Sequence, residues 1–341
     1  MAGALSVVIV GTGNRSIGHM DAVDAVEGME VSAGVDPEAA QRQRFQERYR
    51  RPAFDDIDRL LREDKPDMVA ICTKEYPRHK LTMAAIAGGV KAIVLEKPLA
   101  RTVDEAREMV AAAEAAGTTM IVCHQMRFSD EFVAAKRAID TGEVGTPYYF
   151  RASSYGQLME QGPHMVDMLL YMASDPEVEW VMGAVADIEE GRSTVHPAPA
   201  FVVGYVSFAG GLRAVVECGR RFQRAVGLED VTWLQKRVQA LGTEGMVDAV
   251  VAHHCRLLNS RARGWQTLTE GSAGWDGATI RMYEELRDVL LHGGVHRNNA
   301  QVSLKGFEIV HGIYQSALNR DRAQVPIDAG AFPLEKIMGA T

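Results

Sequence analysis

Residues 6–16 read Ser6-Val-Val-Ile-Val-Gly-Thr-Gly-Asn-Arg-Ser16, a short β-branched run followed at once by a glycine turn. Such a run is typical of a strand covered on both faces. A helix-like stretch, Ile17–Glu27, comes next. In this setting Gly11 permits a tight turn and Gly13 lets a pyrophosphate approach the backbone, with helix-end N–H groups facing the phosphates. The stretch therefore predicts a dinucleotide-binding turn.

The residue that strengthens this prediction is Asp36, at the end of a second expected strand, Val31–Val35. A carboxylate there can accept hydrogen bonds from the ribose hydroxyls and would repel a 2′-phosphate, which favours NAD over NADP. The third position of the glycine pattern is Ser16, which is small enough for close packing. The alternative interpretations are a purely structural turn and a plain strand-end cap.

The first third of the chain alternates strand and helix patterns, which predicts a parallel, doubly wound sheet. The expected strands are Ser6–Val10, Val31–Val35, Met68–Cys72, Ala92–Leu95 and Thr119–Cys123. The expected helices are Ile17–Glu27, Pro37–Tyr49, Ile57–Glu63, His79–Ala87 and Val103–Ala116. Thr102 and Glu105 form a capping-box pattern before the last of these helices, and Gly117 is typical of its end.

After Gln125 the pattern changes to successive strands with short turns, which predicts a mostly antiparallel open sheet. Ala209-Gly210-Gly211 is typical of a hairpin turn. The expected strands are Tyr148–Ser153, Val178–Asp187, Phe201–Phe208, Leu212–Cys218, Val238–Gly242, Met246–Ala252 and Arg256–Leu258, and the helices Asp130–Thr141, Gly162–Ala173, Thr279–Leu291 and Gln301–Leu318. We therefore predict a Rossmann domain over residues 1–125 and an α+β domain over residues 126–341.

Composition limits the classes of partner. The chain has 341 residues, enough for two domains, and is 47% hydrophobic and 24% charged, as soluble proteins are. A net charge of -8 argues against nucleic acid, whose phosphates require a basic face. No apolar run approaches the ~20 residues of a membrane span, and no basic n-region marks a signal peptide. The four cysteines form no CxxC pair, which favours reduced thiols, no metal site and a cytoplasmic location.

Glu96-Lys97-Pro98 directly follows the buried strand Ala92–Leu95. The carboxyl ends of parallel strands are where such sheets bind ligands. An ammonium group there can polarise a hydroxyl or carbonyl oxygen, and Pro98 fixes the backbone that follows. The alternative is a Glu–Lys surface pair beside a turn.

Taken in order, the motifs of this chain resemble those of the Gfo/Idh/MocA family of oxidoreductases. The motifs are Gly11-x-Gly13-x-x-Ser16-x-x-His19, Asp36, Glu96-Lys97-Pro98, Arg127-Phe128 and Gly162-x-His164-x-x-Asp167. The resemblance covers essentially the whole chain. It implies a Rossmann domain, an open-sheet domain for substrate and oligomer contacts, and redox chemistry on sugar or cyclitol carbons. It also implies that Lys97 is catalytic and that His164 exchanges a proton, for which an imidazole with a pKa of about 6.5 is suited.

Two segments depart from the family pattern. Glu160 stands four residues before His164, where many members have Asp, and it could bind a hydroxyl, orient the histidine or mark a different substrate. Thr73–His79 is one residue longer than the common Thr-Pro-x-x-x-His form, which leaves Thr73 as the expected cofactor contact.

The resemblance and the residue chemistry together give a set of expected site residues. The expected catalytic residues are Lys97, His164 and Glu160; the cofactor-binding residues are Gly11, Gly13, Asn14, Arg15, Asp36, Thr73, Glu96 and Lys97; and the substrate-binding residues are Arg127, Glu160, Asp167 and Tyr155. Further candidates on the substrate side are Arg151, Gln157, Trp275 and Tyr283. A structural role for Asp167 is equally compatible with the pattern.

We therefore predict a NAD-dependent dehydrogenase that reversibly oxidises a secondary hydroxyl of a sugar, cyclitol, amino sugar or aminocyclitol. The acidic balance and Glu160 make an amine-bearing substrate attractive. The alternatives are a keto-sugar reductase using NADPH or NADH, a redox-cycling NAD-dependent glycosidase and a non-enzymatic NAD-dependent sensor. Open-sheet packing predicts a homo-oligomer, dimer or tetramer.

Overall fold

The computed structural model describes residues 4–192, 197–220, 235–262, 264–270, 275–328 and 333–339. The chain divides into two compact units. The first contains Met1–Gln125 together with Asp276–Leu304, and the second contains Met126–Trp275 together with Lys305–Thr341. The chain thus leaves the first unit after Gln125 and returns to it once. Within the described ranges no helix has both the length and the apolar character needed to cross a membrane.

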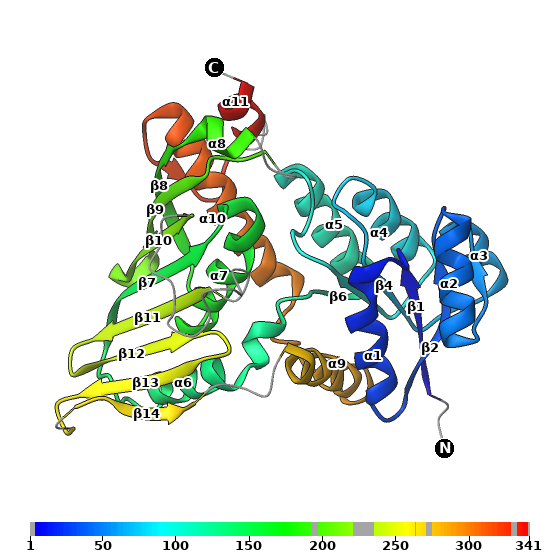
Figure 1. Ribbon diagram of the computed structural model, residues 1–341, viewed down its shortest axis with the longest axis horizontal. Helices are drawn as coiled ribbons and strands as arrows, with labels where there is room; N and C mark the ends of the chain where they lie inside the picture. The colour runs from blue at the N-terminus through cyan, green and yellow to red at the C-terminus, as the bar shows by residue number, and fades with distance from the viewer. Residues whose placement is uncertain are drawn as a thin grey trace. The chain divides into compact units, whose positions relative to one another are not determined.

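The first unit is built on a six-stranded parallel sheet, which confirms the predicted Rossmann architecture (Figure 1). The strand order is β3-β2-β1-β4-β5-β6. The strands are β1 (Leu5–Val10), β2 (Met29–Val35), β3 (Ala53–Phe54), β4 (Met68–Ile71), β5 (Ala92–Leu95) and β6 (Thr119–Val122). β3, a two-residue edge strand, carries too short a pattern to be predicted.

Helices alternate with these strands, and α3, α4 and α5 pack side by side (Figure 1). The helices of this unit are α1 (Ile17–Ala25), α2 (Ala39–Tyr49), α3 (Ile57–Glu63), α4 (Arg78–Ala87), α5 (Val103–Ala116) and α9 (Trp275–His292). The predicted capping box is confirmed, because the Thr102 hydroxyl accepts a hydrogen bond from the Glu105 N–H at 3.2 Å. Gly117 ends α5 with a φ of 69°.

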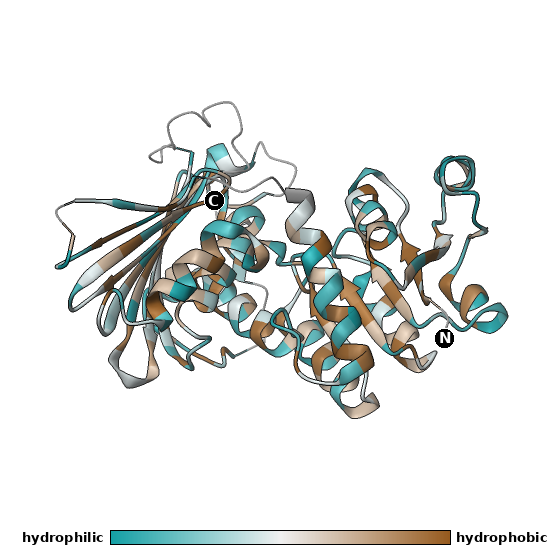
Figure 2. Ribbon diagram, turned by 90° about the horizontal axis from the view of Figure 1, so that it is seen from below, coloured by the Kyte–Doolittle hydropathy of each residue, from teal (hydrophilic) through white to brown (hydrophobic). Residues whose placement is uncertain are grey.

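The apolar strands explain why this sheet forms. Val7, Val8 and Ile9 of β1 are all 0% exposed, as expected for a strand with helices on both faces. The strands are correspondingly among the brown, hydrophobic segments of Figure 2. The sheet therefore presents its polar residues at the strand ends rather than along the strands.

The second unit contains a nine-stranded sheet of order β14-β13-β12-β11-β7-β10-β9-β8-β15. β7 and β10 run parallel, whereas the other neighbouring strands run antiparallel, which confirms the predicted open sheet. The strands are β7 (Pro147–Tyr155), β8 (Val178–Ala186), β9 (Phe201–Phe208), β10 (Arg213–Gly219), β11 (Lys236–Gly242), β12 (Gly245–Val250), β13 (His254–Asn259), β14 (Gln266–Thr269) and β15 (Ala323–Gln324). The hairpin turn at Ala209–Gly211 joins β9 to β10, as predicted.

Helices cover one face of this sheet, and the view in Figure 2 shows no helix of the described residues on its other face. The helices of the unit are α6 (Asp130–Asp140), α7 (Leu158–Met172), α8 (Ile188–Arg192), α10 (Ala300–Asn319, whose first residues belong to the first unit) and α11 (Pro333–Gly339). Two paired glycines let α10 approach closely. A Cβ on Gly183 would lie 2.2 Å from the Ile313 carbonyl oxygen, and one on Gly204 would lie 2.4 Å from Ile313 Cδ1.

Candidate active site

The glycine turn joins β1 to α1 through a 3-10 turn, η1 (Asn14–Ser16). Gly11 has a φ of +84°, and a Cβ there would lie 2.9 Å from the Thr73 Cγ2 atom, so the position strongly favours glycine. A Cβ on Gly13, in contrast, would have no atom within 4 Å. The backbone at Gly13 is therefore open, as a turn that accepts a pyrophosphate must be.

Ser16 replaces the third glycine by bonding within the turn. Its side chain is buried, and its hydroxyl donates a hydrogen bond to the Gly13 carbonyl at 2.7 Å. The Ser16 N–H lies 3.1 Å from the same carbonyl. The hydroxyl thus adds a bond that glycine could not make, and the turn keeps its tight geometry.

Hydrogen bonds to the glycine turn and to the segment after β2 hold the side chain of Asp36 in place. Its Oδ2 atom accepts a hydrogen bond from the Thr12 N–H at 2.9 Å, and its Oδ1 atom accepts one from the Glu38 N–H at 2.9 Å. The side chain of Arg42 donates to the carbonyls of Asp36 and Pro37, at 2.8 Å each. The end of β2 and the glycine turn are therefore tied to each other.

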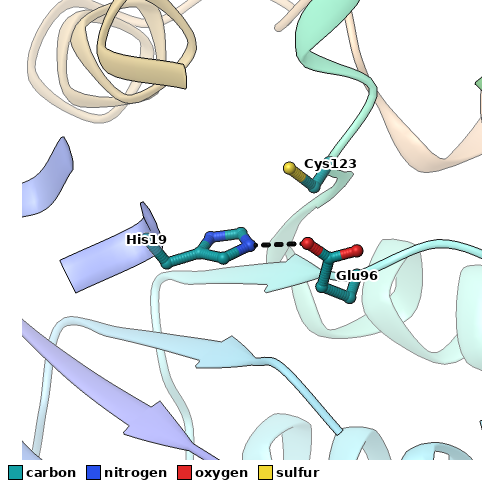
Figure 3. Close-up of side chains that lie close together, drawn as sticks. All are labelled: His19, Glu96 and Cys123. Carbon is teal, nitrogen blue, oxygen red and sulfur yellow. Dashed lines mark hydrogen bonds and ion pairs between the residues drawn. The ribbon is translucent and has the colours of Figure 1, made fainter. Parts of the chain in front are cut away.

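Glu96, directly after β5, is the centre of a buried hydrogen-bond cluster (Figure 3). Its Oε1 atom accepts from Arg15 Nε at 2.8 Å and faces His19 Nε2 at 3.0 Å. Its Oε2 atom accepts from an Arg15 terminal nitrogen and from the Lys97 N–H, at 3.2 Å each. The Lys97–Pro98 peptide that follows is cis. The carboxylate thus links the glycine turn, α1 and the Lys97 turn.

The charges of this cluster follow from its contacts. Burial alone would raise the pKa of Glu96, but the hydrogen bonds and charges of His19 and Arg15 lower it to about 2. Burial would likewise lower the pKa of His19, yet the groups around it, Cys72, Tyr283 and Cys123, leave it well above its usual value. Glu96 is therefore an anion held by cationic donors at neutral pH.

His19, Glu96 and Cys123 each offer an atom with the spacing of metal ligands, all within 4.8 Å of one another (Figure 3). We interpret the group as a hydrogen-bonded cluster. The Arg15 guanidinium already lies against both Glu96 oxygens, and it would repel a divalent cation placed among them. The His19–Glu96 hydrogen bond also occupies the space between two of the three ligand atoms.

Acid should weaken the fold through Glu96. Because its pKa in the folded chain is about 2, against 4.5 ordinarily, the carboxylate adds stability that is complete above pH ~4.5 and lost as pH falls through ~2. We expect Glu96→Gln to lower the free energy of unfolding near neutral pH, and the difference from the wild type to shrink by about 3 kcal/mol towards pH 2. Denaturant unfolding at a series of pH values measures this. Glu63→Gln, at an exposed carboxylate, is the control, and parallel curves for Glu96→Gln and the wild type would contradict the assignment.

Arg78, which sequence reasoning did not single out, lies between two strand-end turns. It begins α4, is 1% exposed, and donates hydrogen bonds to the carbonyls of Thr73 and Pro98. Burial lowers the pKa of Arg78 to about 10. His79 instead contacts Glu108 at 2.9 Å with part of its ring exposed. The Thr73–His79 segment thus places an arginine, rather than its histidine, against the Lys97 turn.

In the second unit, α7 begins at Leu158, four residues earlier than predicted. Glu160 therefore lies in its first turn, and its spacing from His164 and Asp167 places the three residues along one face of the helix. Glu160 is exposed, whereas His164 and Asp167 are each 2% exposed. The helix thus joins the expected proton-transfer residue to an exposed carboxylate.

Arg127 and Asp167, both predicted to bind the substrate, contact each other. Arg127 Nε lies 2.8 Å from Asp167 Oδ2, and a terminal nitrogen of the same guanidinium lies 2.8 Å from Asp175 Oδ1. Asp167 and Asp175 raise the pKa of the buried Arg127 despite its desolvation. The 0% exposure of the Arg127 side chain supports a structural role for this ion-pair cluster.

The remaining substrate candidates are spread over several elements. Gln157 is buried and donates to the Ala198 carbonyl at 2.6 Å, and Arg151 pairs with Glu217 at 2.8 Å. Tyr155 is half-buried at the end of β7. Tyr283 is fully buried within the first unit, and the side chain of Trp275 lies outside the described residues.

Comparison with known proteins shows what the chain is similar to. The sequence model of the Gfo/Idh/MocA family, described as an oxidoreductase family with an NAD-binding Rossmann fold, matches residues 5–124. The D-apiose dehydrogenase of Paraburkholderia graminis is 25% identical over 334 residues, covering 91% of this chain and 86% of its own. Together these matches support a Gfo/Idh/MocA oxidoreductase. The inositol 2-dehydrogenase of Paracoccus denitrificans is 33% identical over 139 residues, covering 40% and 41% of the two chains.

Solved structures of this oxidoreductase fold agree over both units. A levoglucosan dehydrogenase, determined in complex with NADH and levoglucosan, superposes with a TM-score of 0.82 at 19% sequence identity. The match covers 95% of this chain and all of that one. The chain therefore has the two-sheet fold of that structure over nearly its whole length.

Proposed function

We propose that the chain is a NAD-dependent dehydrogenase that reversibly oxidises a secondary hydroxyl of a sugar, cyclitol, amino sugar or aminocyclitol. The observation that carries the proposal is the placement of Lys97. It follows β5, which is separated from β1 and its glycine turn only by β4. The dinucleotide turn and a lysine ammonium thus lie at the same carboxyl edge of one sheet, where such sheets bind ligands.

The residues at this edge fit a bound NAD. The open backbone at Gly13 is a cradle that a Cβ would fill, and Asp36 provides a fixed carboxylate beside the turn. Gly11, Gly13, Asn14 and Arg15 would hold the pyrophosphate, with Asp36 on the ribose and Thr73, Glu96 and Lys97 further along the sheet edge. When bound, NAD supplies the acceptor for the hydride of the oxidised carbon.

The chain's own residues would handle the proton and the orientation of the substrate. In the direction of oxidation, His164 accepts the hydroxyl proton and Lys97 stabilises the negative charge that develops on the oxygen. Glu160, exposed one helical turn before His164, binds a neighbouring hydroxyl or an ammonium group of the substrate. This last contact favours an amine-bearing ring over a neutral one.

The coenzyme preference provides a test of Asp36. We expect Asp36→Ser to raise the Kd for NAD about tenfold and to lower the Kd for NADP, because the repulsion of a 2′-phosphate is removed while Arg42 remains nearby. Isothermal titration with each coenzyme measures both constants. Asp21→Ser, at an exposed aspartate paired with Arg48, is the matched control. An unchanged ratio of the two Kd values in Asp36→Ser would rule out Asp36 as the discriminator.

The activity itself is tested by screening neutral cyclitols and hexoses against amino sugars and aminocyclitols, with NADH absorbance as the readout. NADH formation with one of these classes is the expected result. Reaction only of keto-sugars with a reduced coenzyme would make the enzyme a reductase. Turnover without added NAD and without net NADH would instead favour a redox-cycling enzyme, and ligand binding without turnover would favour a sensor.

We also propose that the helix-free face of the nine-stranded sheet joins copies of the chain into a dimer or tetramer. Side chains alternate along β7 between buried and partly exposed positions. On β8 and β9 the partly exposed positions include the stacked rings of Trp180 and Tyr205 and the half-exposed Met182. Light scattering after gel filtration measures the mass, and a monomer at micromolar concentration would contradict this proposal.

A further inference from the structure

A continuous line of hydrogen bonds runs from α9 to the backbone of Lys97. The Tyr283 hydroxyl lies 2.8 Å from His19 Nδ1, and His19 Nε2 lies 3.0 Å from Glu96 Oε1. The other oxygen of Glu96 accepts a hydrogen bond from the Lys97 N–H at 3.2 Å. All four residues belong to the first unit.

Burial makes the His19 contact the more rigid of the two side-chain contacts to Glu96. The Arg15 side chain is 49% exposed, whereas that of His19 is 4% exposed. An exposed ion pair competes with water and loses strength in salt, but a buried hydrogen bond to a carboxylate does not. His19 is therefore the contact that fixes the orientation of the Glu96 carboxylate.

Tyr283 in turn fixes His19. The two rings meet edge to face, with centroids 5.9 Å apart, and the tyrosine is fully buried. A hydrogen bond at Nδ1 sets both the ring orientation and the nitrogen that faces Glu96. Tyr283 is on α9, which follows most of the second unit in the sequence. The contacts between Tyr283 and His19 therefore join residues far apart in the sequence.

We propose that Tyr283 and His19 are positioning residues that, through Glu96, hold the turn from which Lys97 acts. The inference rests on the proposed function of Lys97. Glu96 connects the two contacts. Its Oε1 atom is hydrogen-bonded to His19, and its Oε2 atom accepts a hydrogen bond from the Lys97 N–H. A carboxylate that loses His19 can rotate about its side-chain bonds, and the Lys97 turn then loses a fixed acceptor. A displacement of about 1 Å at a reacting group can cost on the order of 100-fold in rate.

The experiment compares Tyr283→Phe, His19→Gln and His19→Ala with the wild type in two measurements. The first is amide hydrogen exchange at Lys97 in the protein without coenzyme, which reports the Lys97 N–H to Glu96 bond directly and needs no activity. The second is the separate determination of kcat and KM on the sugar found by screening. Tyr314→Phe, at a fully buried tyrosine of α10 in the second unit, is the matched control.

We expect Tyr283→Phe to accelerate Lys97 amide exchange and to lower kcat about tenfold, with KM within about twofold. His19→Ala should lower kcat further and accelerate Lys97 exchange more. His19→Gln should retain much of the wild-type kcat, because the glutamine amide can still donate to Glu96 and face Tyr283. Tyr314→Phe should change neither quantity. A purely structural role for Tyr283 would alter the melting temperature without changing Lys97 exchange.

Unchanged Lys97 exchange in Tyr283→Phe and His19→Gln would overturn the positioning role, and so would wild-type kcat in an enzyme whose exchange has changed. A wild type that oxidises none of the sugars would instead overturn the proposed function. In that case the exchange measurement would still decide whether Tyr283 and His19 hold the Lys97 turn.

Discussion

A Lys97→Met enzyme is expected to oxidise its sugar on the order of 1,000-fold more slowly than the wild type. Its Kd for NAD should rise by no more than about threefold, because Lys97 is one of several expected coenzyme contacts. Methionine keeps most of the length and apolar stem of lysine but has no N–H donor. The Glu96 cluster uses the backbone N–H of Lys97, which the substitution leaves in place. The loss should therefore fall on the chemical step, where the ammonium stabilises the developing negative charge.

Calorimetric titration of NAD and steady-state kinetics separate the two effects. Lys91→Met is a matched control, because Lys91 directly precedes β5 whereas Lys97 is the second residue after it. Its side chain is 63% exposed and pairs with Asp67. Only the carboxyl end of a parallel strand faces the ligand edge, so Lys91→Met should retain activity. A Lys97→Met enzyme that turns over at the wild-type rate would refute the proposed mechanism.

The first unit could be predicted in detail because its strands are buried on both faces. Such strands appear as short apolar runs bounded by turns, and the strand β5, Ala92–Leu95, has the predicted limits. The helix α3, Ile57–Glu63, also has the predicted limits. The hairpin at Ala209–Gly211 was equally clear, because its turn residues are local. β3 and β15 are two residues long and carry no period at all.

The start of α7 shows why a local rule can fail. Pro163 is typical of a first helical turn, so the sequence favours a start near Gly162. In the structure the helix runs through this proline from Leu158. Packing explains the difference, since Leu158 and most of the residues that follow Gly162 are buried and the apolar contacts outweigh one missing N–H.

The site was predictable as a set of motifs but not as a set of contacts. Gly11, Asp36 and Lys97 lie on the strand ends that their sequence positions indicate. The partners of Glu96 depend on long-range packing, and no local pattern links His19 to Tyr283. The pairing of Arg127 with Asp167 was hidden for the same reason, because charged residues have the same sequence pattern whether they face a substrate or each other.

Alanine substitutions at Gly11 and Gly13 should affect two different quantities, the stability of the fold and the affinity for NAD. Gly13 has a φ of -74° and a ψ of -173°, which any residue adopts, and its added methyl group would meet no atom within 4 Å. Gly13→Ala should therefore unfold at the wild-type temperature. The same methyl group would occupy the space where a pyrophosphate approaches the backbone, so we expect the Kd for NAD to rise on the order of 100-fold.

Gly11→Ala should behave in the opposite way. Its φ of +84° costs a residue with a Cβ about 1–2 kcal/mol, and the methyl group would also press on Thr73. We expect a lower melting temperature, measured by calorimetry, before any coenzyme is added. If Gly13→Ala instead lost stability and kept its affinity for NAD, the turn would be a structural element only. A general weakening of the first unit would affect two such close positions in the same direction. It therefore cannot explain opposite results for Gly11→Ala and Gly13→Ala.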